Sequence, residues 1–381
     1  MAIQHTEYRN TPFHRPSTIT ELLDQTRQRI QVSDEELTEA RRRRDLLAAA
    51  LLAEFPGSET YVNGSVAHGD ALDPLTDIDL GIIVAEARDT HGPGKKGCAD
   101  LQERAANAIR RALGEEFPDL RVEWRNRKRS ILVRFRKAVS FGADDFTADV
   151  IVAIDNPNAD GLLIPRHAGW SRSHPQKHTT MVKAANKDSR YTYARTVRLL
   201  KHWNRKNQKP LCSWNIKALA LDPLTTPTPL AAGMVAWFDH AIADLRDSLT
   251  EDPAGVAEHP ISINEDMTRT EVVDRLERAR DKLVAAIDLE KAGYPMQAHE
   301  QLAKFFNDTE VLPYPDASAL GVEVARKYRE DRAARLKSIN TSAGTAAGAA
   351  AVSGTPAAAA NPVVGHHPGH HTPGTRSWGT R

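Results

Sequence analysis

YVNGSVAHGDALDPLTDIDLGIIV, residues 61–84, is the stretch of this sequence that decides the fold. It predicts a short strand ending at Gly64 and Ser65, a spacer of eleven residues, and a second strand that opens on Asp77 and Asp79. Side chains alternate along a strand, so the two aspartates project from one face. The opposite face carries the apolar side chains Ile78, Leu80, Ile82 and Val84. The stretch therefore predicts a strand with a buried apolar face and an acidic start.

Gly64, Ser65, Asp77 and Asp79 are residue types that bind a metal ion and a phosphate chain. Two carboxylates on one face of a strand lie about 7 Å apart and can share a hard cation such as Mg²⁺. Gly64 lets a phosphate approach the backbone, and Ser65 adds a hydroxyl donor at an expected helix start, where anions are favoured. An Asp-x-Asp pair alone is weak evidence, but this turn, spacer and strand together predict a site for Mg²⁺ and a triphosphate.

A third carboxylate is needed to hold two metal ions and to accept the proton of an attacking hydroxyl. Asp149 supplies it, because it lies on the polar face of a strand pattern at residues 146–154 whose other face is apolar. Asp144 and Asp145 precede this strand and are typical of a turn. We therefore prefer Asp149, and predict that Asp77, Asp79 and Asp149 are the catalytic and metal-binding residues.

The remaining pattern predicts an α+β protein with two lobes. Strands are expected at residues 60–63, 77–84, 121–126, 130–136 and 147–154, and helices at residues 20–32, 33–54 and 99–113. After residue 175 the pattern is helical, with segments at residues 177–207 (interrupted near the middle), 213–221, 228–250, 268–292, 295–306 and 318–338. The prediction is a mixed-sheet nucleotide-binding lobe followed by a helical lobe, with the active site in the cleft between them.

Composition sets the expected domain boundaries. We expect a flexible arm at residues 1–14, N-terminal helices with the catalytic lobe at 15–160, a helical lobe at 161–338 and a disordered tail at 339–381. The tail consists almost entirely of Ala, Gly, Thr, Ser, Pro and His, and cannot bury enough apolar surface to offset its ordering entropy. Its paired histidines at residues 366–371 are interpreted as incidental rather than as a metal site.

Charge and cysteine content exclude several classes of protein. The 381 residues include 51 Lys and Arg against 50 Asp and Glu, and a net charge of +1 argues against a protein that coats duplex nucleic acid. The run Arg41–Arg44 is accordingly interpreted as a solvated helix face rather than a nucleic-acid contact. Cys98 and Cys212 cannot form a four-ligand zinc site or a disulfide framework, which predicts a reduced, cytoplasmic protein without zinc. Met1–Pro16 is polar and no apolar run is long enough for a membrane span, so we expect neither a signal peptide nor a membrane helix.

Later segments narrow the hypothesis. They are Gly169-Trp-Ser-Arg-Ser-His-Pro175, Arg195-Thr-Val-Arg-Leu-Leu-Lys201-His-Trp-Asn204, Cys212-Ser213-Trp214-Asn-Ile-Lys217-Ala-Leu219 and residues 298–313. A Gly-Ser turn, an Asp-x-Asp pair and a later strand aspartate resemble the polymerase-β-type nucleotidyltransferase superfamily. With the later segments, residues 55–313 most resemble the CD-NTases, that is, the cGAS/DncV-like nucleotidyltransferases, and the related oligoadenylate synthases.

The resemblance implies a role for each matching residue. The roles are binding of the triphosphate by Gly64, Ser65, Lys201 and Ser213, and binding of two Mg²⁺ or Mn²⁺ ions by Asp77, Asp79 and Asp149. The alternatives are that Lys201 is a solvated charge beside Arg198 and Arg205, and that Ser213 is only a helix N-cap. Trp170 and Trp203 are expected in the core. Members of the family often have Gly-Thr where this chain has Gly69-Asp70, so an acid near the phosphates is unexpected.

The activity implied is attack of a ribose hydroxyl on the α-phosphate of a nucleoside triphosphate with release of pyrophosphate. A second round would close a cyclic oligonucleotide, which the resemblance links to bacterial antiphage defence. No Cys/His cluster matches the zinc thumb of the animal DNA sensor, so a nucleic-acid activator is not implied, and a protein regulator stays open. Two rival hypotheses are transfer to another acceptor, namely an RNA 3′ end, a protein hydroxyl or an aminoglycoside-like molecule, and a non-catalytic nucleotide- or RNA-binding module.

Overall fold

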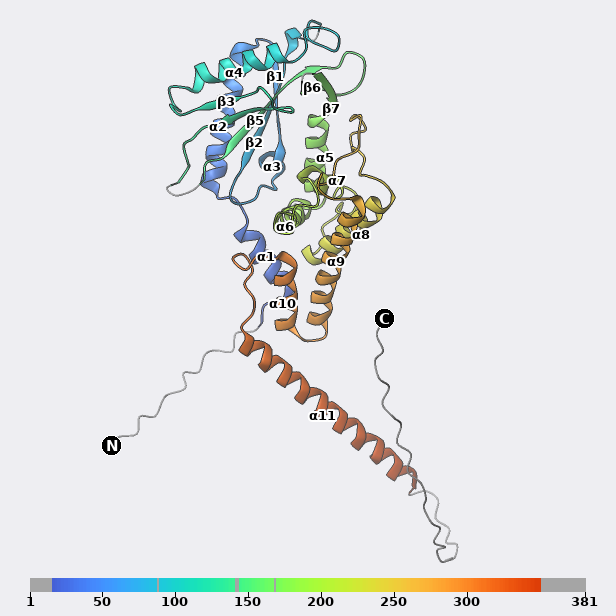
Figure 1. The fold of residues 1–381 in the computed structure, drawn as a ribbon. Helices are drawn as coiled ribbons and strands as arrows, with labels where there is room; N and C mark the ends of the chain where they lie inside the picture. Colours follow the sequence, from blue (N-terminus) through green and yellow to red (C-terminus); the bar gives the residue numbers. More distant parts are fainter. Residues whose placement is uncertain (1–15, 88, 141–143, 168, 351–381) are drawn as a thin grey trace, which may run out of the picture. The chain divides into compact units, whose positions relative to one another are not determined.

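A computed structural model describes residues 16–87, 89–140, 144–167 and 169–350 of the chain (Figure 1). The predicted arm at residues 1–14 and the paired histidines of the tail lie outside the described residues. The chain divides into two units, Met1–Glu323 and Val324–Arg381. The first unit contains a mixed β-sheet and a bundle of helices, which confirms the predicted α+β fold class.

The sheet is built around two parallel strands that carry the aspartates. Its strands run in the order β1 (Glu59–Asn63), β2 (Asp77–Ile83), β5 (Thr147–Asp155), β4 (Ile131–Arg134) and β3 (Arg121–Glu123). Strands β2 and β5 are parallel, and the other neighbouring pairs are antiparallel. Helix α3 (Gly64–His68) follows β1 directly, and a short 3-10 turn at Ala85–Ala87 follows β2.

One face of this sheet is covered by α2 (Asp34–Glu54) and α4 (Ala99–Leu113) (Figure 1). The apolar face predicted for the second strand is confirmed, since Ile78, Leu80, Ile82 and Val84 are all buried in this core. Helix α2 begins as its sequence predicts, because the Ser33 hydroxyl accepts a hydrogen bond from the backbone N–H of Glu36. Burying one face of β2 leaves its acidic positions on the other face.

The sheet extends past residue 160, where the sequence analysis ends the catalytic lobe. Strands β6 (Leu162–Arg166) and β7 (Gly169–Ser173) form a hairpin that the sequence does not predict, and β6 pairs with the last two residues of β5. Pro165 within so short a segment argues against a strand on local pattern alone. The strand conformation of β6 therefore comes from pairing with β7 and with the end of β5, and not from a strong local preference.

Arg43 corrects the interpretation of Arg41–Arg44 as a solvated face. Its side chain is 1% exposed, and its guanidinium donates to Glu39 Oε1 and Asp145 Oδ1, both at 2.8 Å. The guanidinium also lies 4.6–5.3 Å from the ring centroids of Phe146, Phe135 and Phe117. Asp145 is consequently an ion-pair partner rather than a simple turn residue.

The helical part of the first unit contains α5 (Pro175–Asp188), α6 (Thr192–Lys206), α7 (Ser213–Ala218), α8 (Leu230–Asp247), α9 (Arg269–Lys291) and α10 (Pro295–Phe306). The predicted interruption of residues 177–207 falls between α5 and α6, where Arg190 and Tyr191 have positive φ angles. Trp203 is a core residue as predicted, with its ring 5.2 Å from that of Phe238. Helix α1 (Ile19–Arg29) packs in this core, not with the sheet that follows it in sequence.

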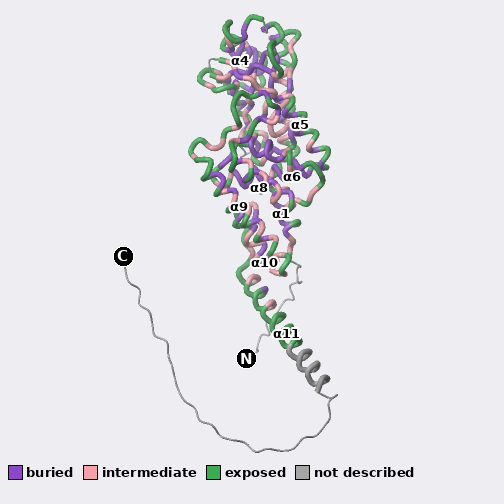
Figure 2. The backbone as a smooth tube through the Cα atoms, turned by 90° about the vertical axis from the view of Figure 1, so that its right-hand side faces the viewer, coloured by how far each residue is buried: buried purple, intermediate pink, exposed green. Residues whose placement is uncertain are grey.

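Helix α11 (Ala317–Ala350) extends past residue 338, where the tail is predicted to begin. The alanines after residue 342 favour extension of a helix that has already formed, whereas Gly344 and Gly348 oppose it. Its residues up to 338 are mostly exposed, whereas buried residues concentrate in the sheet and the bundle (Figure 2). Within the described part of the chain, no helix has both the length and the hydropathy to cross a membrane.

Candidate active site

Gly64 and Asp79 are packed against each other where β1 turns into α3. Gly64 has a φ of +76°, and a Cβ at this position would lie 1.6 Å from Asp79 Oδ2. Glycine is therefore required twice, for the left-handed backbone and for the space that the carboxylate occupies. Asn63 is the register partner of Asp79, so pairing of β1 with β2 brings the Gly64–Ser65 turn to the acidic residues.

The three predicted carboxylates lie on neighbouring parallel strands. Asp79 is the direct register partner of Asp149, and Asp77 that of Thr147. Burial, together with the negative charges of Asp77 and Asp149, raises the pKa of Asp79 to about 7. This cluster of like charges has the hard oxygen donors that Mg²⁺ prefers, and a cation would relieve the repulsion.

Asp149 differs from Asp77 and Asp79 in its contacts and in its position relative to the cleft. Its Oδ1 atom accepts a hydrogen bond from the Ser130 hydroxyl at 2.7 Å and lies 3.5 Å from an Arg127 nitrogen. Asp77 and Asp79 line a cleft beside the sheet. Asp149 lies on the neighbouring strand, β5, and does not line this cleft. Among the described residues, no three His, Cys, Asp or Glu side chains are already gathered as a metal-binding set. The residue types fit the ions, and the third carboxylate is held by Ser130.

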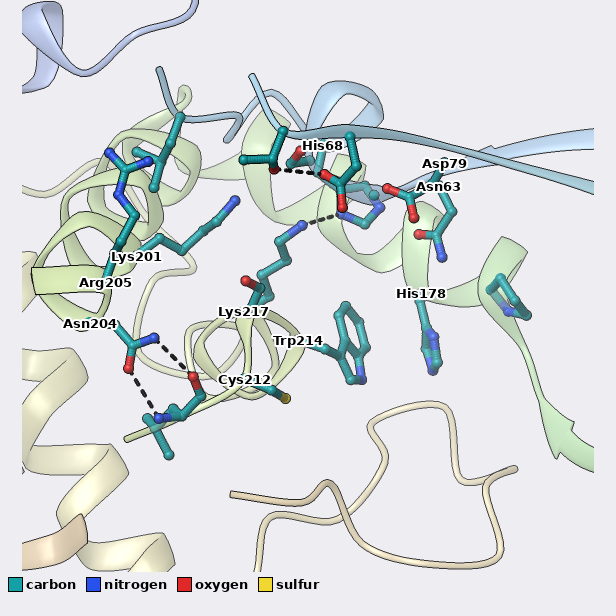
Figure 3. A pocket seen from close by; sticks show the side chains of 18 of the residues that line it. Asn63, His68, Asp79, His178, Lys201, Asn204, Arg205, Cys212, Trp214 and Lys217 are labelled. Carbon is teal, nitrogen blue, oxygen red and sulfur yellow. Dashed lines mark hydrogen bonds between the residues drawn. The ribbon is translucent and has the colours of Figure 1, made fainter. Parts of the chain in front are cut away.

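A cleft of about 570 Å³ lies between the sheet and the helices (Figure 3). Its lining includes the predicted residues Gly64, Ser65, Asp77, Asp79, Lys201 and Ser213. It also includes residues that the sequence analysis did not assign, among them His68, Arg129, His178, Trp214 and Lys217. Six of the seven predicted site residues therefore meet in one cleft, with acids on the sheet side and lysines on the helix side.

Lys201 is neither solvated nor alone, so the alternative of a solvated charge is wrong. It is buried, and its Nζ donates to Asp70 Oδ1 at 2.7 Å and to the Asp70 carbonyl at 2.9 Å. Asp70, the acid that the family resemblance made unexpected, is fully buried and lies 3.1 Å from Nζ of a second buried lysine, Lys217. Asp70 is thus a counter-ion for two lysines of the cleft wall.

His68 completes this network as a neutral ring. Burial and the nearby ammonium of Lys217 lower the pKa of His68 to about 3. Lys217 Nζ donates to His68 Nδ1 at 2.9 Å, so the ring proton is on Nε2, which donates to the Thr179 hydroxyl at 3.1 Å. Figure 3 shows Lys217 reaching up from α7 to His68, beside Lys201 from α6.

Ser213 is the first residue of α7 and is exposed to the cleft. It is not the N-cap, since Cys212 takes that position and its sulfur accepts a hydrogen bond from the Asn215 backbone N–H at 3.4 Å. The N-cap interpretation is therefore wrong by one residue. The Ser213 hydroxyl belongs to the cleft surface, where the resemblance implies that it binds phosphate.

Trp214 and His178 form the aromatic part of the cleft. Their ring centroids are 4.3 Å apart with an angle of 36° between the planes, and both side chains point into the cleft in Figure 3. His178 Nε2 contacts Asp252 Oδ1 at 2.6 Å, and Asp252 also accepts backbone N–H groups from Val256 and Ala257. The sequence does not predict the contact between His178 and Asp252, because the two residues are far apart along the chain.

No protein-family model matches the sequence, and no curated protein is significantly similar to it. Solved structures do match. CdnC from E. coli MS115-1, bound to ATP, is 16% identical with a TM-score of 0.57, and the match covers 79% of this chain and 99% of that one. This chain has the fold of the CD-NTases.

Two further structures support the same fold. The cyclic AMP–GMP synthase DncV from Vibrio cholerae is 14% identical with a TM-score of 0.53, covering 74% of this chain and 94% of that one. The CD-NTase CdnG from Bradyrhizobium diazoefficiens, in complex with GTP, is 16% identical with a TM-score of 0.55, covering 79% and 97%. The CD-NTase fold predicted from the sequence is confirmed.

Proposed function

We propose that this chain is a nucleotidyltransferase that joins nucleoside triphosphates with release of pyrophosphate. The observation that carries the proposal is the charge arrangement of the cleft, with Asp77 and Asp79 beside the Gly64 turn on one side and Lys201 and Lys217 on the other. A triphosphate is attracted to the lysines directly and to the carboxylates through divalent cations. Relatives with this fold that contain ATP or GTP support the choice of substrate class.

Asp77, Asp79 and Asp149 would hold two Mg²⁺ or Mn²⁺ ions. When bound, such ions stabilise negative charge on the transferred phosphate and on the leaving pyrophosphate. Asp149 would accept the proton of the attacking ribose hydroxyl, and its carboxylate is held through Oδ1 by contacts with Ser130 and Arg127. Ser130 therefore fixes the orientation of the proposed base.

The other residues of the cleft bind and orient the triphosphate. The backbone at Gly64 and the hydroxyls of Ser65 and Ser213, which all line the cleft, would bind phosphate oxygens, and Lys201 would add a charged donor. Trp214 offers an aromatic face to the nucleobase of the substrate. The contact of Trp214 with His178 limits the rotation of the Trp214 side chain. Binding at both ends would hold the α-phosphate near the carboxylates.

The product would be a cyclic oligonucleotide that acts as a second messenger in bacterial antiphage defence, made in the cytoplasm. This finer proposal rests on the motifs that resemble the CD-NTases and on the shared fold with a cyclic AMP–GMP synthase. The proposed activity requires no membrane, no zinc ion and no nucleic-acid activator. A protein regulator is compatible with it.

The direct test is to incubate the protein with the four ribonucleoside triphosphates and Mg²⁺ or Mn²⁺, and to identify products by mass spectrometry. We expect a phosphatase-resistant nucleotide and pyrophosphate from triphosphates alone, and no product after chelation of the metal. The double variant Asp77→Asn with Asp79→Asn should abolish product, whereas the exposed Asp119→Asn should have no effect. Unchanged product formation in the double variant would contradict the proposed site. If labelled triphosphate is supplied together with RNA, protein or an aminoglycoside, label in that acceptor without a small nucleotide product would support transfer to the acceptor instead.

A further inference from the structure

Asp70 connects the phosphate-binding turn to the lysines of the cleft wall. Its backbone N–H donates to the Ser65 carbonyl at 3.1 Å, which closes the loop after α3. Its carboxylate lies between Lys201 Nζ, at 2.7 Å from Oδ1, and Lys217 Nζ, at 3.1 Å from Oδ2. Arg198 fastens the same loop to α6 by donating to the Gly69 carbonyl at 2.6 Å. The position of both ammonium groups relative to Ser65 is therefore set through Asp70.

The donor count leaves Lys201 able to bind a ligand without losing Asp70. An ammonium group has three N–H donors, and Lys201 uses two of them on the Asp70 carboxylate and carbonyl. The side chain is 9% exposed, and the cleft is where that exposure lies. The third donor is thus left for a group in the cleft.

The charge count gives the network a net positive charge. Among the groups in direct contact, Lys201 and Lys217 carry two positive charges, Asp70 carries one negative charge, and His68 is neutral because burial lowers its pKa; the Asp79 carboxyl of the same cleft acts on both lysines from further away. A buried charge without a counter-ion is costly, so a network with one excess ammonium favours an anion on its open side. The anion that the cleft is proposed to bind is a triphosphate.

We propose that Asp70 is a positioning residue for triphosphate binding, which holds Lys201 and Lys217 at the cleft wall so that Lys201 meets the phosphates already oriented. The inference rests on the proposed function for the identity of the ligand. Asp70 acts through Lys201 and does not touch the nucleotide. Its loss should weaken binding of the triphosphate and leave the chemical step nearly intact.

The test is a double-mutant cycle between Asp70→Asn and Lys201→Met. The dissociation constant of a non-hydrolysable ATP analogue with Mg²⁺ is measured by calorimetry, and KM and kcat are measured with triphosphates. We expect Asp70→Asn to raise the dissociation constant and KM about tenfold, the usual effect of losing one charged hydrogen bond, with kcat changed less than about threefold. In the Lys201→Met background, the effect of Asp70→Asn should be much smaller, because only the contact of Asp70 with Lys217 remains.

A second pair of variants covers the case in which Asp70→Asn alone does not fold. Lys217→Met and the combination of Lys217→Met with Asp70→Asn are compared, because replacing both members of a buried ion pair is tolerated better than removing one. The combination should still bind the analogue about tenfold more weakly than Lys217→Met, because Lys201 has lost its carboxylate partner. Asp73→Asn, an exposed acid in the same loop, is the matched control and should bind as the wild type does.

Each other outcome overturns a definite part of the inference. Additive effects of Asp70→Asn and Lys201→Met would show that Asp70 does not act through Lys201. Tighter binding by Asp70→Asn would show that Asp70 competes with the phosphates. A coupled binding cycle without any nucleotide product would leave the positioning role and overturn the proposed function, and a wild type that binds no triphosphate analogue would overturn both.

Discussion

Arg43 and the lysine pair Lys201 and Lys217 are buried cations in opposite electrostatic situations. Arg43 has two carboxylate partners, Glu39 and Asp145, a backbone carbonyl acceptor at Lys137, and aromatic rings around its guanidinium. The lysines share the single carboxylate of Asp70 and border the cleft.

The difference indicates which buried cation stabilises the fold and which serves a ligand. At Arg43 each of the three guanidinium nitrogens donates a hydrogen bond within the protein, which indicates a role in folding. At the lysine pair two ammonium groups share one directly contacting carboxylate, and an anionic ligand would balance the second ammonium group. Burial alone therefore does not distinguish structural from functional cations. The number of carboxylate partners per buried cation does distinguish them.

Arg43→Met is expected to have the largest effect, on stability. It leaves the partly exposed carboxylates of Asp145 and Glu39 without their buried cation, and losing hydrogen bonds to charged groups costs about 1.5–3 kcal/mol. Urea unfolding should show this loss, while the KM for triphosphate in the remaining folded protein should be unchanged. The exposed Arg41→Met in the same helix should change the free energy of unfolding by less than about 0.5 kcal/mol. A raised KM with normal stability would reverse the comparison.

Gly64→Ala should have the next largest effect, on activity. The new Cβ would lie 1.6 Å from Asp79 Oδ2, so the carboxylate must move. A displacement of about 1 Å at reacting groups costs about 100-fold in rate, and kcat/KM for nucleotide joining should fall by at least that much. Gly57→Ala is the matched control, since Gly57 has a φ of +75° and nothing within 4 Å of the added Cβ. Equal activities of the two variants would refute the role of the Gly64 turn.

Lys217→Met should affect substrate binding and spare stability, the reverse of Arg43→Met. Removing one of the two ammonium groups leaves Asp70 paired with Lys201. It also removes the buried ammonium group of Lys217, whose pKa is lowered by burial. We expect KM for triphosphate to rise about tenfold and the free energy of unfolding to change by less than about 1 kcal/mol. Steady-state kinetics and urea unfolding measure the two effects. Lys183→Met, an exposed lysine of α5, should alter neither quantity; a large loss of stability in Lys217→Met would make the lysine pair structural.

The smallest expected effect is a pH dependence of the Arg43 site. Hydrogen bonds from Arg42 and then Arg43 lower the pKa of Glu39 from 4.5 to about 2. A carboxyl whose folded pKa is depressed stabilises the fold above its unfolded pKa, and this stabilisation is lost as the pH falls from about 4.5 toward 2. Glu39→Gln should therefore be less stable than wild type at pH 6, by less than about 1 kcal/mol for this partly exposed pair, and the difference should shrink at pH 3. A difference that grows with acidity would contradict the assignment.

Much of the acidic side of the cleft is predictable from the sequence because its determinants are local. Alternation along β2 places Asp77 and Asp79 opposite a buried apolar face, and a Gly-Ser turn eleven residues earlier marks the phosphate-binding loop. The helices after residue 175 also follow their own periodicity closely. The hairpin β6–β7 does not, because its short strands depend on pairing with each other and, for β6, with the end of β5.

The sequence by itself determined the fold class and the residue types of the catalytic face, since both follow from alternation and spacing within a few tens of residues. Only the tertiary structure decided the electrostatics. Lys201 and Lys217 lie 131 and 149 residues from their partners Asp70 and His68, and Arg43 lies 102 residues from Asp145. Whether a charged side chain is solvated, paired or left in excess depends on which distant groups are buried beside it, and no local pattern records that.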